Sequence, residues 1–169
     1  MSEPGAQARQ AEPTAFDPAV PRLERLFRAT VEIGAPLSVG MTPLGERRII
    51  PITGGRVEGE RFSGEVLPGG ADWQLVRPDG TALLQARYTL RARDGALVYV
   101  CNRGVRAGRP EVLARIARGE AVDPSTYYFR TTPRFETGAP QYAWLNDLVA
   151  VCSAARAAGA VTLDFFAVG

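Results

Sequence analysis

The chain has 169 residues, 46% of them apolar and 22% charged, and its net charge of +2 at pH 7 is ordinary for a globular domain. It has no histidine and all 20 basic residues are arginine, which excludes histidine triads, histidine metal sites, lysine Schiff bases and P-loops. The arginines are interleaved with 18 acidic residues and form no basic stripe, so we do not expect nucleic-acid binding.

The first part of the chain predicts no fold of its own. Residues 1–21 are rich in Ala, Pro, Gln and Glu and have little apolar surface to offset the entropy of ordering. We therefore expect a flexible tail over 1–21 and a single β domain over 22–169. Within that domain, apolar and polar residues alternate over 27–33, which is typical of a half-buried strand, and 47–53 and 61–67 predict two further strands.

Two hairpins follow in the middle of the chain. The predicted strands 72–77 and 81–91 are separated by Pro78-Asp79-Gly80, and the second of them is separated from strand 96–103 by Arg93-Asp94-Gly95. An Asp-Gly pair between alternating runs is a strong hairpin signal. We expect three-residue loops with glycine in the left-handed conformation.

The last third predicts one helix and more strands. Residues 109–119 favour a short helix, because Pro110 suits the first helical position and Gly119 suits the C-terminal cap. Residues 127–134 and 161–168 are strand-like, whereas 141–155 fit either a helix or a strand. About nine strands and one helix indicate a mainly β fold, a single antiparallel meandering β-barrel, because closure removes exposed sheet edges.

The hairpin registers assign the two faces of these three strands. With three-residue loops, one face carries no arginine and the other carries three, and burying an unpaired arginine is costly. The arginine-free face is therefore predicted to be the interior, with aliphatic residues towards one end and polar residues towards the other. Those polar residues are Asp72, Tyr88 and Asn102. An apolar interior ending in a few polar groups is typical of a small-molecule pocket.

Other features indicate a cytoplasmic protein without a cofactor. The N-terminus has no basic start followed by an apolar stretch, and no apolar run is long enough for a membrane helix. Cys101 and Cys152 are too few for a disulfide framework and are interpreted as small buried thiols, with a disulfide or a reactive thiol as alternatives. No spacing predicts a zinc site, so no metal or cofactor is expected, and neither membrane nor nucleic acid is an expected partner.

Several short motifs, in order and spacing, resemble an uncharacterised bacterial family, domain of unknown function 3237. They are Ile52-Thr53-Gly54-Gly55, the run 64–73, Arg87-Tyr88, Phe135-Glu136-Thr137 and 142–146. The resemblance spans residues 23–168 and implies a closed barrel of lipocalin-like shape, akin to the allene oxide cyclase and dirigent barrels, but no agreed activity. The positions that match by motif are Asp72, Trp73, Arg87, Tyr88, Glu136, Trp144 and Asn146.

The candidate site residues each have a structural alternative. Asp72 is the candidate catalytic acid or base, or else it caps the Gly69-Gly70 turn. Tyr88 and Asn102 are candidate ligand contacts, or a satisfied polar pair. The remaining ligand-binding candidates also have structural alternatives: an ion pair with Arg130 for Glu136, a core position for Trp144 and loop hydrogen bonds for Asn146.

Three functions fit these residues. The first is a barrel that binds a small, partly apolar molecule, and the second is a cofactor-independent isomerase, cyclase or lyase in which Asp72 moves a proton. The third is a structural module that forms homo-oligomers through outward apolar residues. These residues are Trp73, Leu75, Leu83 and Leu97.

Overall fold

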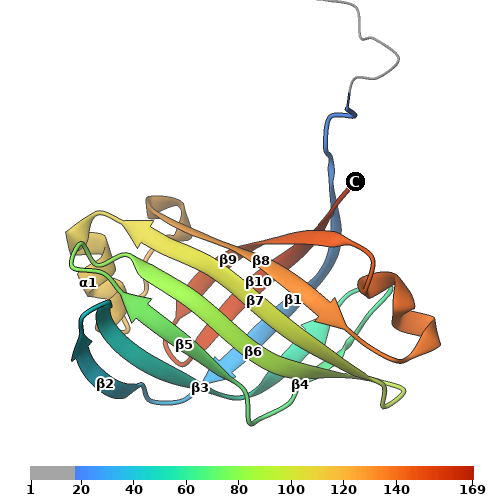
Figure 1. Cartoon of the computed structure of the whole chain (residues 1–169), viewed down its shortest axis with the longest axis horizontal. Coiled ribbons are helices and arrows are strands. Elements are labelled where there is room, and N and C mark those ends of the chain that lie inside the picture. Colours follow the sequence, from blue (N-terminus) through green and yellow to red (C-terminus); the bar gives the residue numbers. More distant parts are fainter. Residues whose placement is uncertain (1–17) are drawn as a thin grey trace, which may run out of the picture.

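Alternating sequence patterns produce ten strands in the computed structural model, which describes residues 18–169 (Figure 1). The predicted tail lies largely outside the described residues, and residues 18–22 belong to no helix or strand. The strands are β1 (Leu23–Ile33), β2 (Leu37–Thr42), β3 (Gly45–Glu58), β4 (Gly64–Val66), β5 (Ala71–Val76), β6 (Ala82–Ala92), β7 (Leu97–Gly108), β8 (Tyr127–Glu136), β9 (Val149–Ala157) and β10 (Ala160–Val168).

The strands close into an antiparallel barrel with eight positions around its wall. Strands β6 to β10 form a meander, and β1 closes the wall by pairing with β10 on one side and β3 on the other. β4 and β5 share one position, because both lie between β3 and β6. β2 adds a hairpin arm to β3. The mainly β barrel with one short helix is thus confirmed.

Gly55 allows β1 and β3 to approach closely where the barrel closes. Its φ of +139° lies in the region that favours glycine, and a Cβ there would lie 2.1 Å from the Thr30 carbonyl oxygen. The Gly54-Gly55 pair thus shapes the barrel wall.

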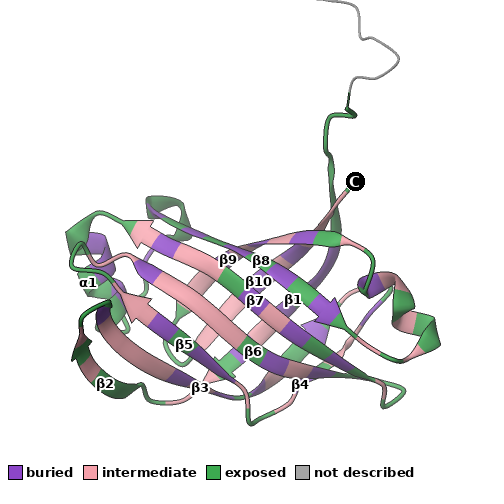
Figure 2. Cartoon of the chain, viewed as in Figure 1, coloured by how far each residue is buried: buried purple, intermediate pink, exposed green. Residues whose placement is uncertain are grey.

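The two hairpins have the predicted loops and register. The Arg77 amide donates to the Thr81 carbonyl, and the Ala92 amide donates to the Ala96 carbonyl, both at 2.9 Å. Gly80 has a φ of +83° and Gly95 of +89°. The predicted interior face is therefore confirmed, and buried and exposed residues alternate along the neighbouring strand β8 as well (Figure 2).

The helix is confirmed, but some strand predictions need correction. α1 (Pro110–Ala117) lies inside the predicted 109–119. β2 was not predicted, and the strand expected over 61–67 is only β4. The ambiguous segment divides into a 3-10 helix, η2 (Pro140–Leu145), and strand β9, since Pro140 suits the start of a helical turn.

The barrel is filled with aromatic rings at one end and covered by α1 at the other. Phe27 packs on Phe165 with ring centroids 4.6 Å apart, and Phe62 packs edge-on against Tyr142 of η2 at 5.1 Å. η2, orange in Figure 1, lies at the opposite end from α1, whose apolar residues Val112, Leu113 and Ile116 are buried. The interior next to α1 is therefore free of this aromatic core.

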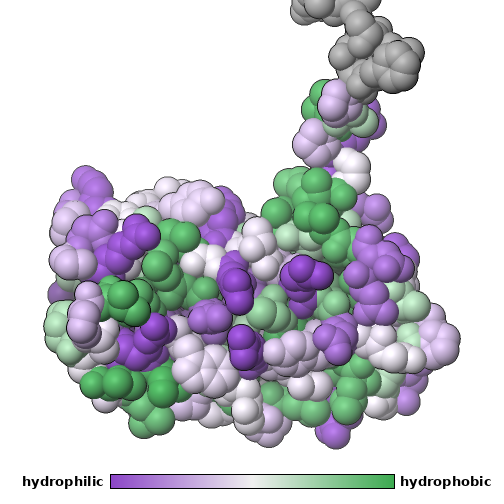
Figure 3. All heavy atoms as spheres, viewed as in Figure 1, coloured by the Kyte–Doolittle hydropathy of each residue, from purple (hydrophilic) through white to green (hydrophobic). Residues whose placement is uncertain are grey.

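The β2 arm carries exposed apolar side chains. Leu37, Val39, Met41 and Leu44 are all more than half exposed, and Figure 3 shows apolar surface at the corner of the molecule where β2 lies. Of the outward patch predicted to mediate oligomerisation, Trp73 and Leu97 are exposed, whereas Leu75 and Leu83 are partly buried.

Candidate functional site

A cavity of about 110 Å³ occupies the half of the barrel that the aromatic core leaves empty. Side chains from the inner faces of the strands form its walls, and Ile116 and Ala117 of α1 contribute to one side. Most of the wall is apolar. Its large apolar members are Val31, Ile33, Ile50, Ile52, Leu84, Ile116, Phe129, Val161 and Leu163.

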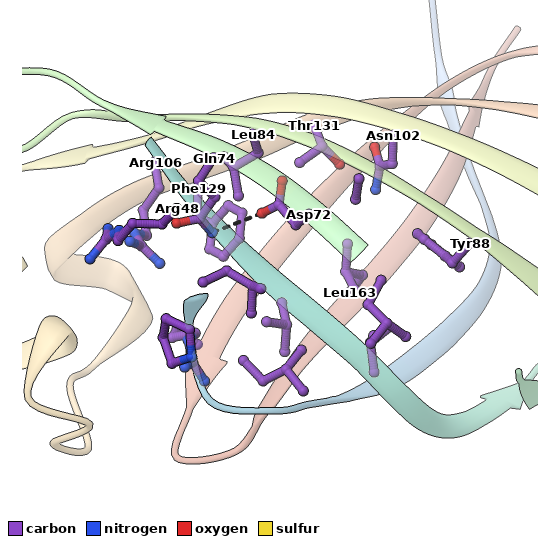
Figure 4. A pocket seen from close by; sticks show the side chains of 18 of the residues that line it. Arg48, Asp72, Gln74, Leu84, Tyr88, Asn102, Arg106, Phe129, Thr131 and Leu163 are labelled. Carbon is purple, nitrogen blue, oxygen red and sulfur yellow. Dashed lines mark hydrogen bonds between the residues drawn. The ribbon is translucent and has the colours of Figure 1, made fainter. Parts of the chain in front are cut away.

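Among residues 18–169, Asp72 is the only acidic residue that lines this cavity. It lies on β5 between Ile50 and Ala86 of the neighbouring strands and is 8% exposed. Its Oδ1 accepts a hydrogen bond from the Gln85 amide, and its Oδ2 accepts one from Gln74 Nε2, both at 2.8 Å (Figure 4). Neither bond reaches the Gly69-Gly70 turn, so the turn-capping alternative is wrong.

The environment of Asp72 favours its protonated form. Burial raises the pKa of this carboxyl group above its ordinary value of 3.8, although the two hydrogen bonds and the charges of Arg106 and Arg48 act in the opposite direction. A carboxyl group with a raised pKa keeps its proton to a higher pH than a free one, which favours proton exchange with a bound molecule.

Tyr88 and Asn102 lie in the same cavity, as predicted, and Thr131 joins them. All three are buried, and the Tyr88 hydroxyl, Asn102 Oδ1 and Thr131 Oγ1 have no hydrogen-bond partner within the described chain. The Tyr88 hydroxyl lies near the Asn102 side chain, but the pair does not reach hydrogen-bond geometry. The alternative of a satisfied polar pair is therefore not supported. Burial raises the pKa of Tyr88, so this phenol stays protonated.

Three arginines line the cavity and were not predicted. Arg48 comes from β3, Arg106 from β7 and Arg156 from β9. Arg106 is 8% exposed, and burial, with repulsion from Arg48 and Arg156, lowers its pKa to about 10. Figure 4 shows Arg48 and Arg106 together at one end of the cavity, with Asp72 between them and Tyr88.

A sequence signal for one of these arginines existed. Arg106 continues the period-two series of inward residues that includes Asn102, on a strand that extends to Gly108 rather than ending near 103. Because the predicted strand ends at residue 103, the sequence pattern does not place Arg106 on the inner face.

The other predicted ligand contacts lie outside this cavity. Glu136 is exposed at the end of β8 and, among the described residues, makes no salt bridge with Arg130. Trp144 lies in η2 rather than in a strand, with Arg61 Cζ 4.0 Å from the centre of its ring. Asn146 Oδ1 accepts from the Thr137 amide at 2.9 Å and its Nδ2 donates to the Thr137 carbonyl at 3.0 Å, which is the loop-bonding alternative.

Within residues 18–169, no three Cys, Asp or Glu side chains gather to hold a metal ion, and no helix is long and apolar enough to cross a membrane. Cys101 and Cys152 are free thiols. Burial raises the pKa of Cys152 to about 12, which makes it a poor nucleophile.

Comparisons with known proteins agree with this fold. Residues 21–168 match the family described as protein of unknown function (DUF3237). The chain is 52% identical over 139 residues to a UPF0311 protein of Rhodopseudomonas palustris, covering 82% of this chain and 91% of that protein. A crystal structure of a β-barrel-like protein from Acinetobacter baumannii superposes with a TM-score of 0.81 at 44% identity, covering 91% and 99% of the two chains.

A more distant relative carries an activity in its name. The hydroalkoxylation enzyme phnH of Penicillium herquei is 27% identical over 133 residues, covering 79% of this chain and 74% of that protein. The match over most of the chain and the close bacterial relatives establish that the protein belongs to the DUF3237 (UPF0311) family of β-barrel proteins.

Proposed function

We propose that this protein binds a small, partly apolar organic molecule inside its barrel. The observation that carries this proposal is a set of five buried side-chain atoms that have no hydrogen-bond partner within residues 18–169, all from residues that line this cavity. They are Arg48 Nε, Tyr88 Oη, Asn102 Oδ1, Arg106 Nε and Thr131 Oγ1.

Such atoms are costly in an empty protein. A buried polar group without a partner destabilises the fold by about 1–3 kcal/mol, and buried polar groups in folded proteins usually have partners. Five unpartnered atoms around one space are explained if a ligand supplies the missing partners. Waters can satisfy some of them, but the mostly apolar wall favours a molecule with an apolar body.

Native mass spectrometry of freshly purified protein, followed by denaturing extraction, tests this proposal. We expect a retained small molecule, and its loss when Ala86→Leu fills part of the cavity. Thr89→Leu is the matched control, because Thr89 lies three residues further along β6 on the outer face. A barrel that retains nothing and shows no thermal stabilisation by a library of small amphipathic molecules contradicts the proposal.

The position of Asp72 favours a second candidate, a cofactor-independent enzyme of the kind that the phnH relative's name describes. Hydroalkoxylation adds an O–H group across a carbon–carbon double bond. In this barrel, the Asp72 carboxyl group would give a proton to one carbon and take the hydroxyl proton as the C–O bond forms at the other carbon. Where the double bond is conjugated to a carbonyl group, the Tyr88 hydroxyl would donate a hydrogen bond to the carbonyl oxygen, on which negative charge develops as the C–O bond forms.

Isotope exchange separates the enzyme from the simple binding protein without knowledge of the substrate. A proton-transferring Asp72 should place deuterium on carbon in the extracted ligand after incubation in D2O, and Asp72→Asn should prevent this. Binding without carbon exchange in the wild-type protein excludes the enzyme candidate while leaving the binding function intact.

A further inference from the structure

One end of the cavity carries an unusual excess of positive charge. Arg48, Arg106 and Arg156 all line it, and Asp72 is the only acidic residue that the described part of the chain contributes to the wall. The two oxygens of Asp72 accept hydrogen bonds from Gln74 and Gln85, and no salt bridge within residues 18–169 joins Asp72 to any of the three guanidinium groups.

We propose that this arginine end of the cavity binds the carboxylate of a small organic acid whose apolar body fills the rest of the space. The inference rests on the proposed binding function and names the class of molecule that the barrel takes.

The contrast with the surface arginines supports a ligand anion. On the surface, Arg28 pairs with Asp164 at 2.6 Å and Arg91 pairs with Glu65 at 2.6 Å. Within residues 18–169, the three cavity arginines make no salt bridge, although burial makes an unpaired charge far more costly there than in water. Arg106 in particular is buried and has no acidic partner within the described residues, and an external anion would supply that partner.

The available donors suit a carboxylate. Arg48 Nε and Arg106 Nε are buried and have no partner in the described chain. Arg156 is held in place by Nη1, which donates to the carbonyls of Ala157 and Ala160 at the β9–β10 turn, and its other N–H groups remain available. The planar fork of a guanidinium group matches the two oxygens of a carboxylate.

The rest of the cavity defines the body of the ligand. Its volume of about 110 Å³ is somewhat below that of the engineered apolar cavity of about 150 Å³ that holds benzene. The cavity therefore limits the apolar body of the ligand to about the size of a single ring or a short chain. Beyond Asp72, the Tyr88 hydroxyl and Asn102 Oδ1 can bond a hydroxyl or carbonyl substituent at the far end of such a molecule.

Matched pairs of carboxylates and carboxamides test the charge requirement directly. Benzoate with benzamide, and hexanoate with hexanamide, differ little in shape but differ in charge. We expect isothermal titration to show that the carboxylates bind more tightly than their amides by about tenfold or more, since hydrogen bonds between charged groups are the stronger ones. Arg106→Met should remove this preference while changing amide binding by less than about threefold.

Two further variants keep the test decisive. Arg48→Met, at a partly exposed position, replaces Arg106→Met if the latter fails to fold. Arg134→Met is the control of equal charge change, because Arg134 is exposed on the outer face of β8 and makes no salt bridge among the described residues. It should retain the full preference for carboxylates.

The outcomes separate this inference from the proposed function. Equal binding of amides and carboxylates overturns the anion site but leaves the binding barrel standing. Tighter binding of phenylphosphonate than of benzoate overturns the carboxylate assignment in favour of a phosphoryl group. Failure of every compound to bind, with no retained molecule in the purified protein, overturns both.

Discussion

Replacing Arg106 with methionine should make the empty protein more stable, although it removes a polar residue from the site. Burial and repulsion from Arg48 and Arg156 lower the pKa of Arg106 from 12.5 to about 10. A difference of about 2.5 between the two pKa values corresponds to about 3 kcal/mol against the charged form in the folded protein. Methionine keeps an unbranched apolar stem, but it loses the contact of Arg106 Cζ with the Phe129 ring at 5.9 Å, which is worth about 1 kcal/mol.

The net expectation for Arg106→Met is a gain of about 2 kcal/mol in the free energy of unfolding at pH 7. Urea unfolding followed by the fluorescence of Trp73 and Trp144 measures it, with the protein first unfolded and refolded to release any retained molecule. The urea midpoint should rise by about 1 M. Arg134→Met should change the free energy of unfolding by less than about 0.5 kcal/mol. A lower midpoint for Arg106→Met would refute the reasoning, because the guanidinium group would then be compensated within the empty barrel.

Three other predictions concern Asp72 and the close approach of β1 and β3 at Gly55. Asp72→Asn should raise the free energy of unfolding at neutral pH, because burial raises the pKa of Asp72 and the folded protein disfavours its charged form. This gain should shrink as the pH falls towards 3.8, and urea series across pH that show it growing instead would contradict the assignment. Binding of a carboxylate near Asp72 should be accompanied by proton uptake, because the added negative charge raises the pKa of Asp72. Titration calorimetry in buffers of different ionisation enthalpy measures this uptake, and Asp72→Asn should abolish it. Gly55→Ala should destabilise the barrel by about 2 kcal/mol or more, because its Cβ would meet the Thr30 carbonyl. Thermal melts measure this loss. The control Gly138→Ala should leave the melt almost unchanged, since nothing among the described residues lies within 4 Å of a Cβ at that position.

The parts of the site that the sequence predicts are those fixed by local signals. Asp79-Gly80 and Asp94-Gly95 set both hairpin loops, and each loop fixes the register of the strands beside it. With the register known, period two places Asp72, Tyr88 and Asn102 on one face.

The rest of the site depends on strand pairings that no Asp-Gly signal marks in the sequence. Arg48 reaches the cavity because β3 pairs with β5, and Arg156 because β9 pairs with β10. Neither pairing has a tight turn with an Asp-Gly signal. The rule that arginines face outwards, correct for strands 72–103, also argues against an inward Arg106, so the exception marks the site. Trp144 and Asn146 do not line the cavity for a different reason. Trp144 lies in a 3-10 helix and Asn146 caps its end, so the alternation of a strand does not apply to them.

The protonation of Asp72 links the binding protein and the enzyme. In the empty cavity, burial raises the pKa of this carboxyl group while the charges of Arg106 and Arg48 lower it. A bound carboxylate would neutralise those charges and add a negative charge of its own, so both effects would raise the pKa further. Asp72 would then carry a proton in the complex and act as a hydrogen-bond donor or a general acid rather than a base. If the bound acid is saturated, Asp72 can donate its proton only to an oxygen of the ligand, and the barrel then only binds the molecule. If the acid is unsaturated and its double bond lies against Asp72, the proton can be donated to a carbon atom. That proton transfer is the first step of an addition reaction.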